Sequence, residues 1–296
     1  MKTYVKNFLI DFDFEEEDRD CLFGVYSTIV ANGDANEILC GILEDYNNNM
    51  NINWDGVLEK VKVIANITDI HEYTVYLVVC ICLSRKLKDY YAENNISLDV
   101  WRETVADFKY KLTECKLIKG ICGAFCFGWH GKFFHLNLFA FGRLQFRMNT
   151  LRYDYNKNGI EMKIGDPVVD IHIPRTGTPI DEASCRDSYK RAKEFFKDRF
   201  KPGKPIPFVC SSWLLSEVNL TMLSEKSNIR RFIGDFEILA NRYMKQGDYS
   251  ETWRLFDMDY TGNLDDFPED SSFRRAYKKY LKEGGRFGSA YGIFFM

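Results

Sequence analysis

The stretch VVDIHIPRTGTPIDEASC, residues 168–185, contains the sequence pattern most informative about the fold class. Its first half reads as a β-strand, and a short turn containing Gly177 follows before a helix begins. Thr178 is a candidate N-cap, Pro179 fits the first helical position, and Asp181 completes a pair that resembles a capping box. A strand, a tight turn and a helix N-terminus in this order are typical of phosphate-binding corners.

The helix predicted over residues 179–198 leads to a further strand, PFVCSSWLL, at 207–215. A strand–helix–strand of this length predicts a parallel crossover. The other elements that we expect in this half are strands at 144–148, 160–164 and 286–296 and helices at 227–247 and 271–285. These elements predict a mixed, largely antiparallel sheet flanked by helices.

The first 119 residues carry apolar side chains at helical spacing and no strand pattern. About five helices are expected, and Ser97 is the candidate N-cap of the last of them. The pattern changes near Gly120, where glycines and aromatic residues become dense. The sequence therefore predicts an α+β protein with a helical N-terminal domain at 1–119 and a second domain at 120–296.

The charge, the apolar runs and the cysteine content limit the binding partners and the cellular location that we expect. The net charge is −3 and the pI is near 5.9, so the chain lacks the basic footprint of a nucleic-acid-binding protein. The most apolar run, residues 74–83, is far shorter than the roughly 20 residues of a membrane span. The charge and the short apolar run predict no nucleic-acid or membrane partner. The acidic N-terminus and nine irregularly spaced cysteines predict a cytoplasmic protein. The sequence indicates no oligomeric state.

Two stretches are weak candidates for metal sites. The first is an irregular set of two cysteines and two histidines between Cys122 and His135, in which bulky aromatics fill the gaps and core packing is favoured over zinc. The second begins at Asp257 and resembles a calcium loop, but Pro268 stands where the bidentate glutamate belongs. No metal is expected at either stretch.

One face of the predicted strand 168–173 carries chemistry. Side chains alternate along a strand, so Asp170 and His172 share a face at roughly 7 Å along it. Histidine titrates near neutral pH, which makes His172 a candidate general base for an amine. A half-solvated sheet face without chemistry is at least as well supported. The acids Asp181 and Glu182 at the helix start would repel a phosphate there.

A hydrolase is a weaker alternative. The chain contains no nucleophile elbow and no phosphate-binding P-loop. Cys210 and Ser212 lie on a predicted strand instead of a sharp turn. One of the four histidines would have to lie beside them to complete a triad.

Several stretches together resemble the GNAT-like acyltransferase domain proteins of bacteria, which join a helical N-terminal domain to a GNAT-type domain. The resemblance covers residues 120–296 well and the helical half more loosely. The stretches that carry it are GRLQF at 142–146, HIP and the glycine loop at 172–177, FVCSSWLLS at 208–216, SNIRRF at 227–232 and KEGGRFGSAYGIF at 282–294.

The resemblance implies an acyl-CoA-dependent N-acyltransferase that uses acetyl-CoA or another acyl-CoA and a small-molecule amine acceptor. In this family two parallel strands splay apart around the pantetheine arm, and a loop after the first strand holds the pyrophosphate. Ile171 and Ile173 would then line the arm, and Arg175, Thr176, Gly177 and Thr178 would form the loop. Ser212 or Trp213 would lie near the acyl group, beside the catalytic candidates Asp170 and His172.

The loop departs from the family pattern. Arg175-Thr176-Gly177-Thr178 is shorter than the usual Q/R-x-x-G-x-G/A, and two acids follow it. This departure supports the second hypothesis, a non-catalytic binding protein that retains the GNAT fold.

Overall fold

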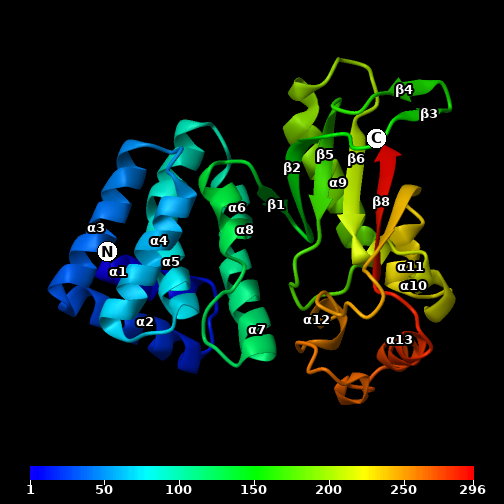
Figure 1. Ribbon diagram of the computed structural model, residues 1–296. Coiled ribbons are helices and arrows are strands. Elements are labelled where there is room, and N and C mark those ends of the chain that lie inside the picture. The colour runs from blue at the N-terminus through cyan, green and yellow to red at the C-terminus, as the bar shows by residue number, and fades with distance from the viewer. The chain divides into compact units, whose positions relative to one another are not determined.

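The computed structural model describes residues 1–296, which divide into two compact units at Ala140 and Phe141. Figure 1 shows the first unit as helices and the second as a sheet with helices. Each unit is described by itself. The sequence predicted a boundary after residue 119, whereas residues 120–140 group with the helices.

The first unit contains eight helices. They are α1 (Lys2–Asp11), α2 (Glu16–Ala31), α3 (Gly33–Asn48), α4 (Trp54–Thr68), α5 (Glu72–Glu93), α6 (Leu98–Val105), α7 (Asp107–Lys119) and α8 (Phe127–Phe134). The predicted cap at Ser97 is confirmed, because its side chain accepts a hydrogen bond from the Asp99 amide. The single helix expected after Ser97 is divided at Ala106 into α6 and α7.

Helix α5 forms the centre of the first unit. The apolar run at residues 74–83 lies in its middle and is buried at every position, as the sequence predicted. No helix in residues 1–296 has the length and apolarity needed to cross a membrane.

Helix α8 was not expected from the sequence. Its start is fixed by Trp54 and Tyr76, whose side chains each donate a hydrogen bond of 2.8 Å to the Phe127 carbonyl. Gly131 lies against the Trp54 ring, where an added Cβ would come within 2.8 Å of the ring. The aromatic side chains and glycines after Gly120, from which the sequence predicted a second domain, therefore pack a helix onto the first unit.

The sheet has the strand order β1-β2-β5-β6-β8-β7, and a separate hairpin pairs β3 with β4. Strands β5 and β6 are parallel, and the pairs β2–β5, β6–β8 and β7–β8 are antiparallel. This confirms the predicted α+β class and mostly antiparallel sheet. The strands are β1 (Phe139–Phe141), β2 (Leu144–Thr150), β3 (Tyr155–Lys157), β4 (Ile160–Met162), β5 (Pro167–His172), β6 (Pro207–Ser212), β7 (Glu237–Tyr243) and β8 (Gly288–Phe295).

One face of the sheet packs on helix α9 (Glu182–Phe196). The Tyr189 ring contacts the rings of Phe208 and Phe294 at centroid distances of 6.4 and 4.8 Å. The remaining helices of this unit are short or peripheral. They are α10 (Val218–Met222), α11 (Asn228–Ile233), α12 (Trp253–Phe256), α13 (Ser272–Lys282) and the 3-10 turns η1 (Lys197–Arg199), η2 (Trp213–Leu215) and η3 (Leu264–Asp266).

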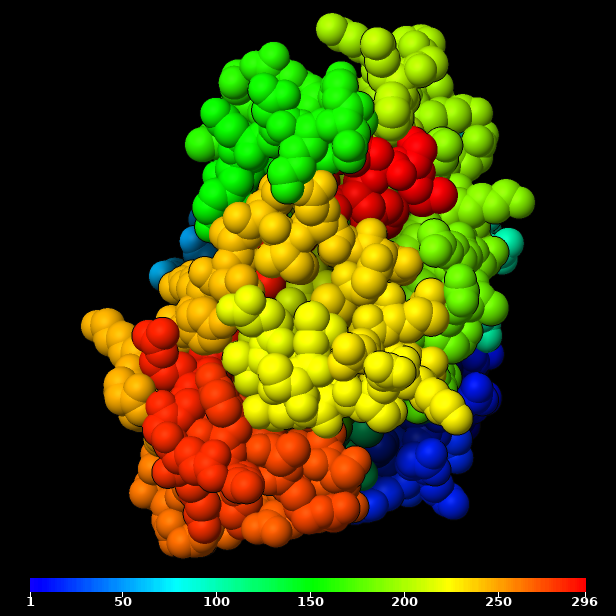
Figure 2. Space-filling model, turned by 90° about the vertical axis from the view of Figure 1, so that its right-hand side faces the viewer, coloured from blue at the N-terminus to red at the C-terminus, as the bar shows by residue number.

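The opposite face carries a small apolar cluster that includes Tyr155, Val168, Val209 and Tyr291. The β3–β4 hairpin packs against this cluster, and the Tyr155 ring lies 5.1 Å from the Phe295 ring. Figure 2 shows the hairpin (green) beside the last residues of the chain (red) at the surface.

The predicted helix at 227–247 is wrong. Residues Asn228–Ile233 form α11, and Glu237–Tyr243 form the edge strand β7, which pairs with β8 through a bulge between Ile238 and Ala240. Apolar spacings of three and four persist through both elements, so periodicity alone gave one helix. The hydrogen-bonding edge of β8 overrides that local pattern.

Two predicted boundaries also need correction. Helix α9 begins at Glu182 with Asp181 as its N-cap, so Thr178 and Pro179 lie in the preceding loop. Strand β6 ends at Ser212, because residues Trp213–Leu215 turn into η2.

Candidate functional site

The two parallel strands separate at a defined point. Their ladder pairs Val169 with Phe208 and ends with Ile171 opposite Cys210. Beyond that pair each strand bonds only on its outer side, His172 to Gln145 of β2 and Ser211 to Tyr291 of β8. The β5–β6 ladder therefore does not continue beyond Ile171 and Cys210. This parting is available to an extended ligand that bonds to strand backbone.

Asp170 lies one residue before the parting and is buried. Its Oδ2 accepts hydrogen bonds from Asn149 Nδ2 at 2.8 Å and Arg147 Nε at 3.2 Å, both on the neighbouring strand β2. Burial raises the pKa of the Asp170 carboxyl, but contacts with His172, Asn149 and Arg147 outweigh burial and hold the pKa below its usual value. Asp170 is a fixed carboxylate at neutral pH.

His172 lies on the same face as Asp170, as the alternation predicted. Its Nε2 is 3.4 Å from Asp170 Oδ2, and its side chain is 21% exposed. A carboxylate beside one ring nitrogen favours a proton on that nitrogen, which leaves Nδ1 as the basic position. The pair thus has the arrangement of an imidazole oriented by a carboxylate.

Tyr291 of β8 was not singled out from the sequence. It pairs with Ser211, so it lies on the same sheet face as Asp170 and His172 and packs in the cluster with Val168. Burial raises the pKa of Tyr291 to about 12, so its hydroxyl stays protonated near neutral pH. It is an additional proton donor on the face that carries His172.

Ser212 is not brought together with Asp170 and His172. Strand alternation places its side chain on the face opposite to Ser211. Its Oγ accepts a hydrogen bond from the Leu214 amide at 3.2 Å and thereby caps η2. Trp213 follows the parted end of β6 and stacks against Phe273 and Phe287 at centroid distances of 6.4 and 5.9 Å.

Arg143 holds the loop that follows β5. Its Nη1 donates to the Pro174 carbonyl at 2.9 Å, and its Nε donates to the carbonyls of Thr178 and Pro179 at 3.2 Å each. Gly177 has a left-handed φ of 79°, which permits the tight turn at the loop tip. No sequence pattern indicated this contact, because it joins residues 31 to 36 positions apart.

Two carboxylates already occupy groups of the predicted phosphate loop. Asp181 caps α9 by accepting from the Ser184 amide at 3.0 Å and the Ser184 hydroxyl at 2.7 Å. The Ser184 amide and hydroxyl lower the pKa of the Asp181 carboxyl.

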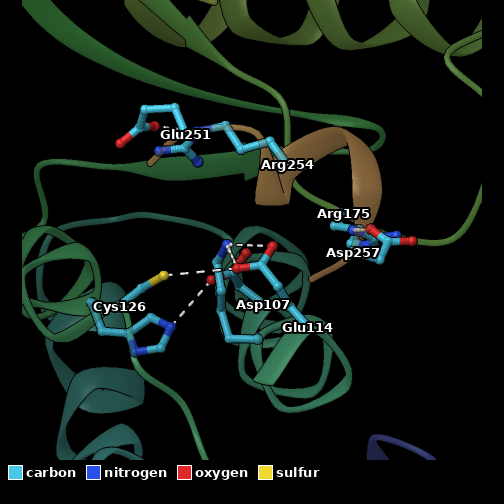
Figure 3. Close-up of polar contacts among 9 residues, drawn as sticks. Asp107, Glu114, Cys126, Arg175, Glu251, Arg254 and Asp257 are labelled. Carbon is cyan, nitrogen blue, oxygen red and sulfur yellow. Dashed lines mark hydrogen bonds and ion pairs between the residues drawn. The ribbon is translucent and has the colours of Figure 1, made fainter. Parts of the chain in front are cut away.

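Arg175 forms an ion pair with Asp257, and Figure 3 shows the two side chains in contact. Thr176 and Thr178 join their hydroxyls at 2.7 Å on the exposed side of the loop.

The helical unit contains a buried polar network that includes His130. His130 Nε2 lies 3.1 Å from Asp107 Oδ2, and its Nδ1 lies 3.0 Å from the Tyr76 hydroxyl. Burial lowers the pKa of His130, and the Asp107 contact opposes that shift. Cys126 Sγ contacts Glu114 at 3.7 Å, as drawn in Figure 3. Because His130 is enclosed and partnered on both nitrogens, it is a satisfied core histidine.

The cysteines and histidines between Cys122 and His135 do not converge. His135 Nε2 lies 2.9 Å from the Ile52 carbonyl, while Cys122 contacts Asp18. No group of three or more His, Cys, Asp or Glu side chains in residues 1–296 is arranged to hold a metal ion.

Family models match the chain along most of its length. Residues 4–136 match the N-acyltransferase N-terminal domain, and residues 138–294 match the GNAT-like C-terminal domain. The chain belongs to the family of proteins with this GNAT-like C-terminal domain. The resemblance drawn from short stretches of the sequence, to GNAT-like acyltransferase domain proteins with a helical N-terminal domain, is thus confirmed. No curated protein matches the chain.

Solved structures share the fold of the GNAT-like chain. An acyltransferase in complex with decanoyl-CoA and teicoplanin has a TM-score of 0.72 at 22% identity, covering 98% of this chain and 87% of that chain. An acyltransferase in complex with CoA and 10C-Teicoplanin gives the same values. An acyltransferase in complex with decanoyl-CoA has a TM-score of 0.61 at 23% identity, and the match spans 74% of this chain and 65% of that chain. At sequence identities of 22 to 23%, the similarity to these structures shows a shared fold.

Proposed function

We propose that this protein is an acyl-CoA-dependent N-acyltransferase that transfers an acyl group directly to an amine. The observation that carries the proposal is the parting of β5 and β6 after Ile171 and Cys210. A pantetheine arm is extended and carries amide groups, so it can bond to the backbone of both strands beyond the end of their ladder. In this proposal Ile171 and Ile173 line the arm.

The loop after β5 is the proposed phosphate site. Arg175 supplies the charge, and the Gly177 amide and the hydroxyls of Thr176 and Thr178 supply donors on an exposed turn. The amides of Thr176 and Thr178 already donate within the loop. Arg143 fixes this loop through its hydrogen bonds to the carbonyls of Pro174, Thr178 and Pro179. Asp181 occupies the N-terminus of α9, so we place the phosphates along the loop instead of at the helix end.

The proposed chemistry uses the face that carries Asp170. The acceptor amine loses a proton to Nδ1 of His172, while Asp170 holds the imidazole in position. The amine nitrogen forms a bond to the thioester carbonyl carbon, and the carbon–sulfur bond then breaks. Tyr291 donates a proton to the leaving CoA sulfur. Strand amides at the parting polarise the carbonyl oxygen, and no covalent enzyme intermediate forms.

Trp213 is the residue that we assign to the acyl chain. It is half-buried and packs in a cluster whose partly buried members include Met222, Met244 and Met258. Methionine side chains adapt to irregular apolar ligands. Structures with this fold have been solved with decanoyl-CoA, which makes an acyl chain longer than acetyl the first to test.

Binding of acyl-CoA is the first experiment. Thermal unfolding is followed with acetyl-CoA, decanoyl-CoA and free CoA, with ATP as an anion control. Saturating acyl-CoA raises the unfolding temperature, because a ligand at a hundredfold excess over Kd stabilises the folded state by about 2.7 kcal/mol. Acyl-CoA at millimolar concentration that shifts the transition no more than ATP would contradict the proposal. Turnover is then measured as CoA release with amine acceptors.

A second candidate function is a binding protein that retains the fold without catalysis. Asp181 at the start of α9 and Asp257 on Arg175 favour it, since both carboxylates occupy groups that phosphates would use. Absence of CoA release on any amine, with or without CoA binding, would support this candidate.

The hydrolase alternative has less support. Cys210 is buried, and burial raises its pKa well above that of an ordinary thiol. Its thiolate is therefore scarce, and Ser212 is engaged as a cap.

A further inference from the structure

One carboxylate is shared by two arginines beside the proposed phosphate loop. Asp257 Oδ1 pairs with Arg175, and its Oδ2 pairs with Arg274 of α13. Arg274 has further partners, the Leu255 carbonyl at 2.8 Å and Asp270 at 2.9 Å. Asp257 closes α12 in a left-handed conformation with a φ of 60°, and its side chain is 15% exposed. Its position is thus fixed by backbone geometry and by α13.

The Arg175 side chain is held by Asp257 alone and makes no ion pair within its own loop. It is the only basic residue of the loop 173–181, and its side chain is 36% exposed. The other acids at this end of α9 are engaged separately. Asp181 caps the helix, and Glu182 contacts Arg186 at 3.8 Å and Arg231 at 3.5 Å. Asp257 is the carboxylate that neutralises the charge of the loop.

Carboxylates and phosphates bind guanidinium groups in the same way, through parallel hydrogen bonds. An anion that reaches Arg175 must therefore displace Asp257 or bind beside its negative charge. After displacement Asp257 still pairs with Arg274, so no unpaired carboxylate is left in a half-buried place. The exchange replaces one ion pair of Arg175 by another without exposing a new charge.

We propose that Asp257 is an affinity-determining residue that competes with the CoA phosphates for Arg175. The inference rests on the proposed CoA site and adds a residue to it. Asp257 lies more than 75 positions from the loop in sequence, and it weakens binding through the phosphates alone. The pantetheine part of the ligand is unaffected by it.

The variant Asp257→Asn tests this directly, since asparagine has the same shape and tolerates left-handed backbone. Dissociation constants for CoA and for pantetheine, which has no phosphates, are measured by calorimetry on the full chain. We expect Asp257→Asn to bind CoA about tenfold more tightly, because one repelling charge near the phosphates is removed. The pantetheine constant stays unchanged, and Arg175→Gln added to Asp257→Asn abolishes the gain.

Asp235→Asn is the matched control, because Asp235 is a half-buried partner of Arg186 at 3.2 Å and its neutralisation changes the net charge equally. CoA binding that is the same in wild type and Asp257→Asn, or tightened equally by Asp235→Asn, overturns this inference and leaves the proposed function standing. The same gain for pantetheine also overturns it. Failure of both wild type and Asp257→Asn to bind CoA overturns both proposals.

Discussion

Ile171 of β5 and Cys210 of β6 form the last residue pair of the one parallel ladder in the sheet. One residue further on, His172 still pairs with β2 and Ser211 with β8. The sheet therefore stays continuous on both outer sides while its centre opens. This opening begins next to the Asp170–His172 pair, so an extended ligand in it would end beside the proposed base, His172.

His172 and Asp170 are predicted to act in turnover more than in binding. His172→Gln lowers kcat at least about 100-fold, because a positioned general base contributes that much or more. The Kd for acyl-CoA changes less than about threefold, since the imidazole meets the amine and not the CoA. Steady-state kinetics and calorimetry give the two numbers.

Ser212→Ala serves as the control for that prediction. Its hydroxyl caps η2 and is not part of the Asp170–His172 pair, so kcat is expected to stay within about threefold of wild type. Equal losses of kcat in Ser212→Ala and His172→Gln would show that the assignment of the base is wrong.

Asp170 is predicted to make the fold sensitive to acid. Its folded-state pKa lies below the ordinary carboxyl value, so the stabilisation is complete above about pH 4 and is lost as the pH falls through the folded pKa. Asp170→Asn removes this term and lowers the free energy of unfolding at pH 7 by about 2 kcal/mol. Urea unfolding of both proteins between pH 7 and pH 3 measures it. A difference that does not shrink at low pH would contradict this account.

Cys21 in the helical unit is predicted to be a reactive thiol. A hydrogen bond with Cys122 lowers the pKa of Cys21 to about 7, although burial opposes the shift. Its rate of alkylation by iodoacetamide, followed by peptide mass spectrometry, should rise with a midpoint near that pH. Cys122→Ala removes the hydrogen bond and moves the midpoint upward. A midpoint that is the same in both proteins would refute the pairing.

Trp213 is predicted to set the acyl-chain preference. Trp213→Ala weakens binding of decanoyl-CoA about tenfold relative to acetyl-CoA, because apolar contact worth about 0.8 kcal/mol per methylene is lost along the longer chain. Competition calorimetry with the two thioesters gives the ratio. Leu98→Ala, a change at an exposed apolar residue of the helical unit, should leave the ratio unchanged.

Local patterns in the sequence were sufficient for the centre of the fold. Alternation along residues 168–173 placed Asp170 and His172 on one face, and the length of the crossover predicted a parallel partner. The edge strand β7 was missed, because its residues carry helical spacing and only pairing with β8 makes them a strand. Helix α8 was missed because contacts with Trp54 and Tyr76 fix its start.

The supporting residues of the candidate site were missed for a related reason. Arg147 and Asn149 reach Asp170 across neighbouring strands, and Arg143 reaches a loop more than 30 positions away. Polar residues at alternate positions of β2 were the available signal for the first two. The contact of Arg175 with Asp257 depends on how α12 and α13 pack, which no short stretch of sequence encodes.

Amide hydrogen exchange with and without decanoyl-CoA measures whether acyl-CoA binds where β5 and β6 separate. We predict slower exchange on binding at residues 172–177 and 211–213, where the strands part and the loop follows, with little change in β7 at the far edge. Binding that protects other residues and leaves these two segments unchanged would contradict the account.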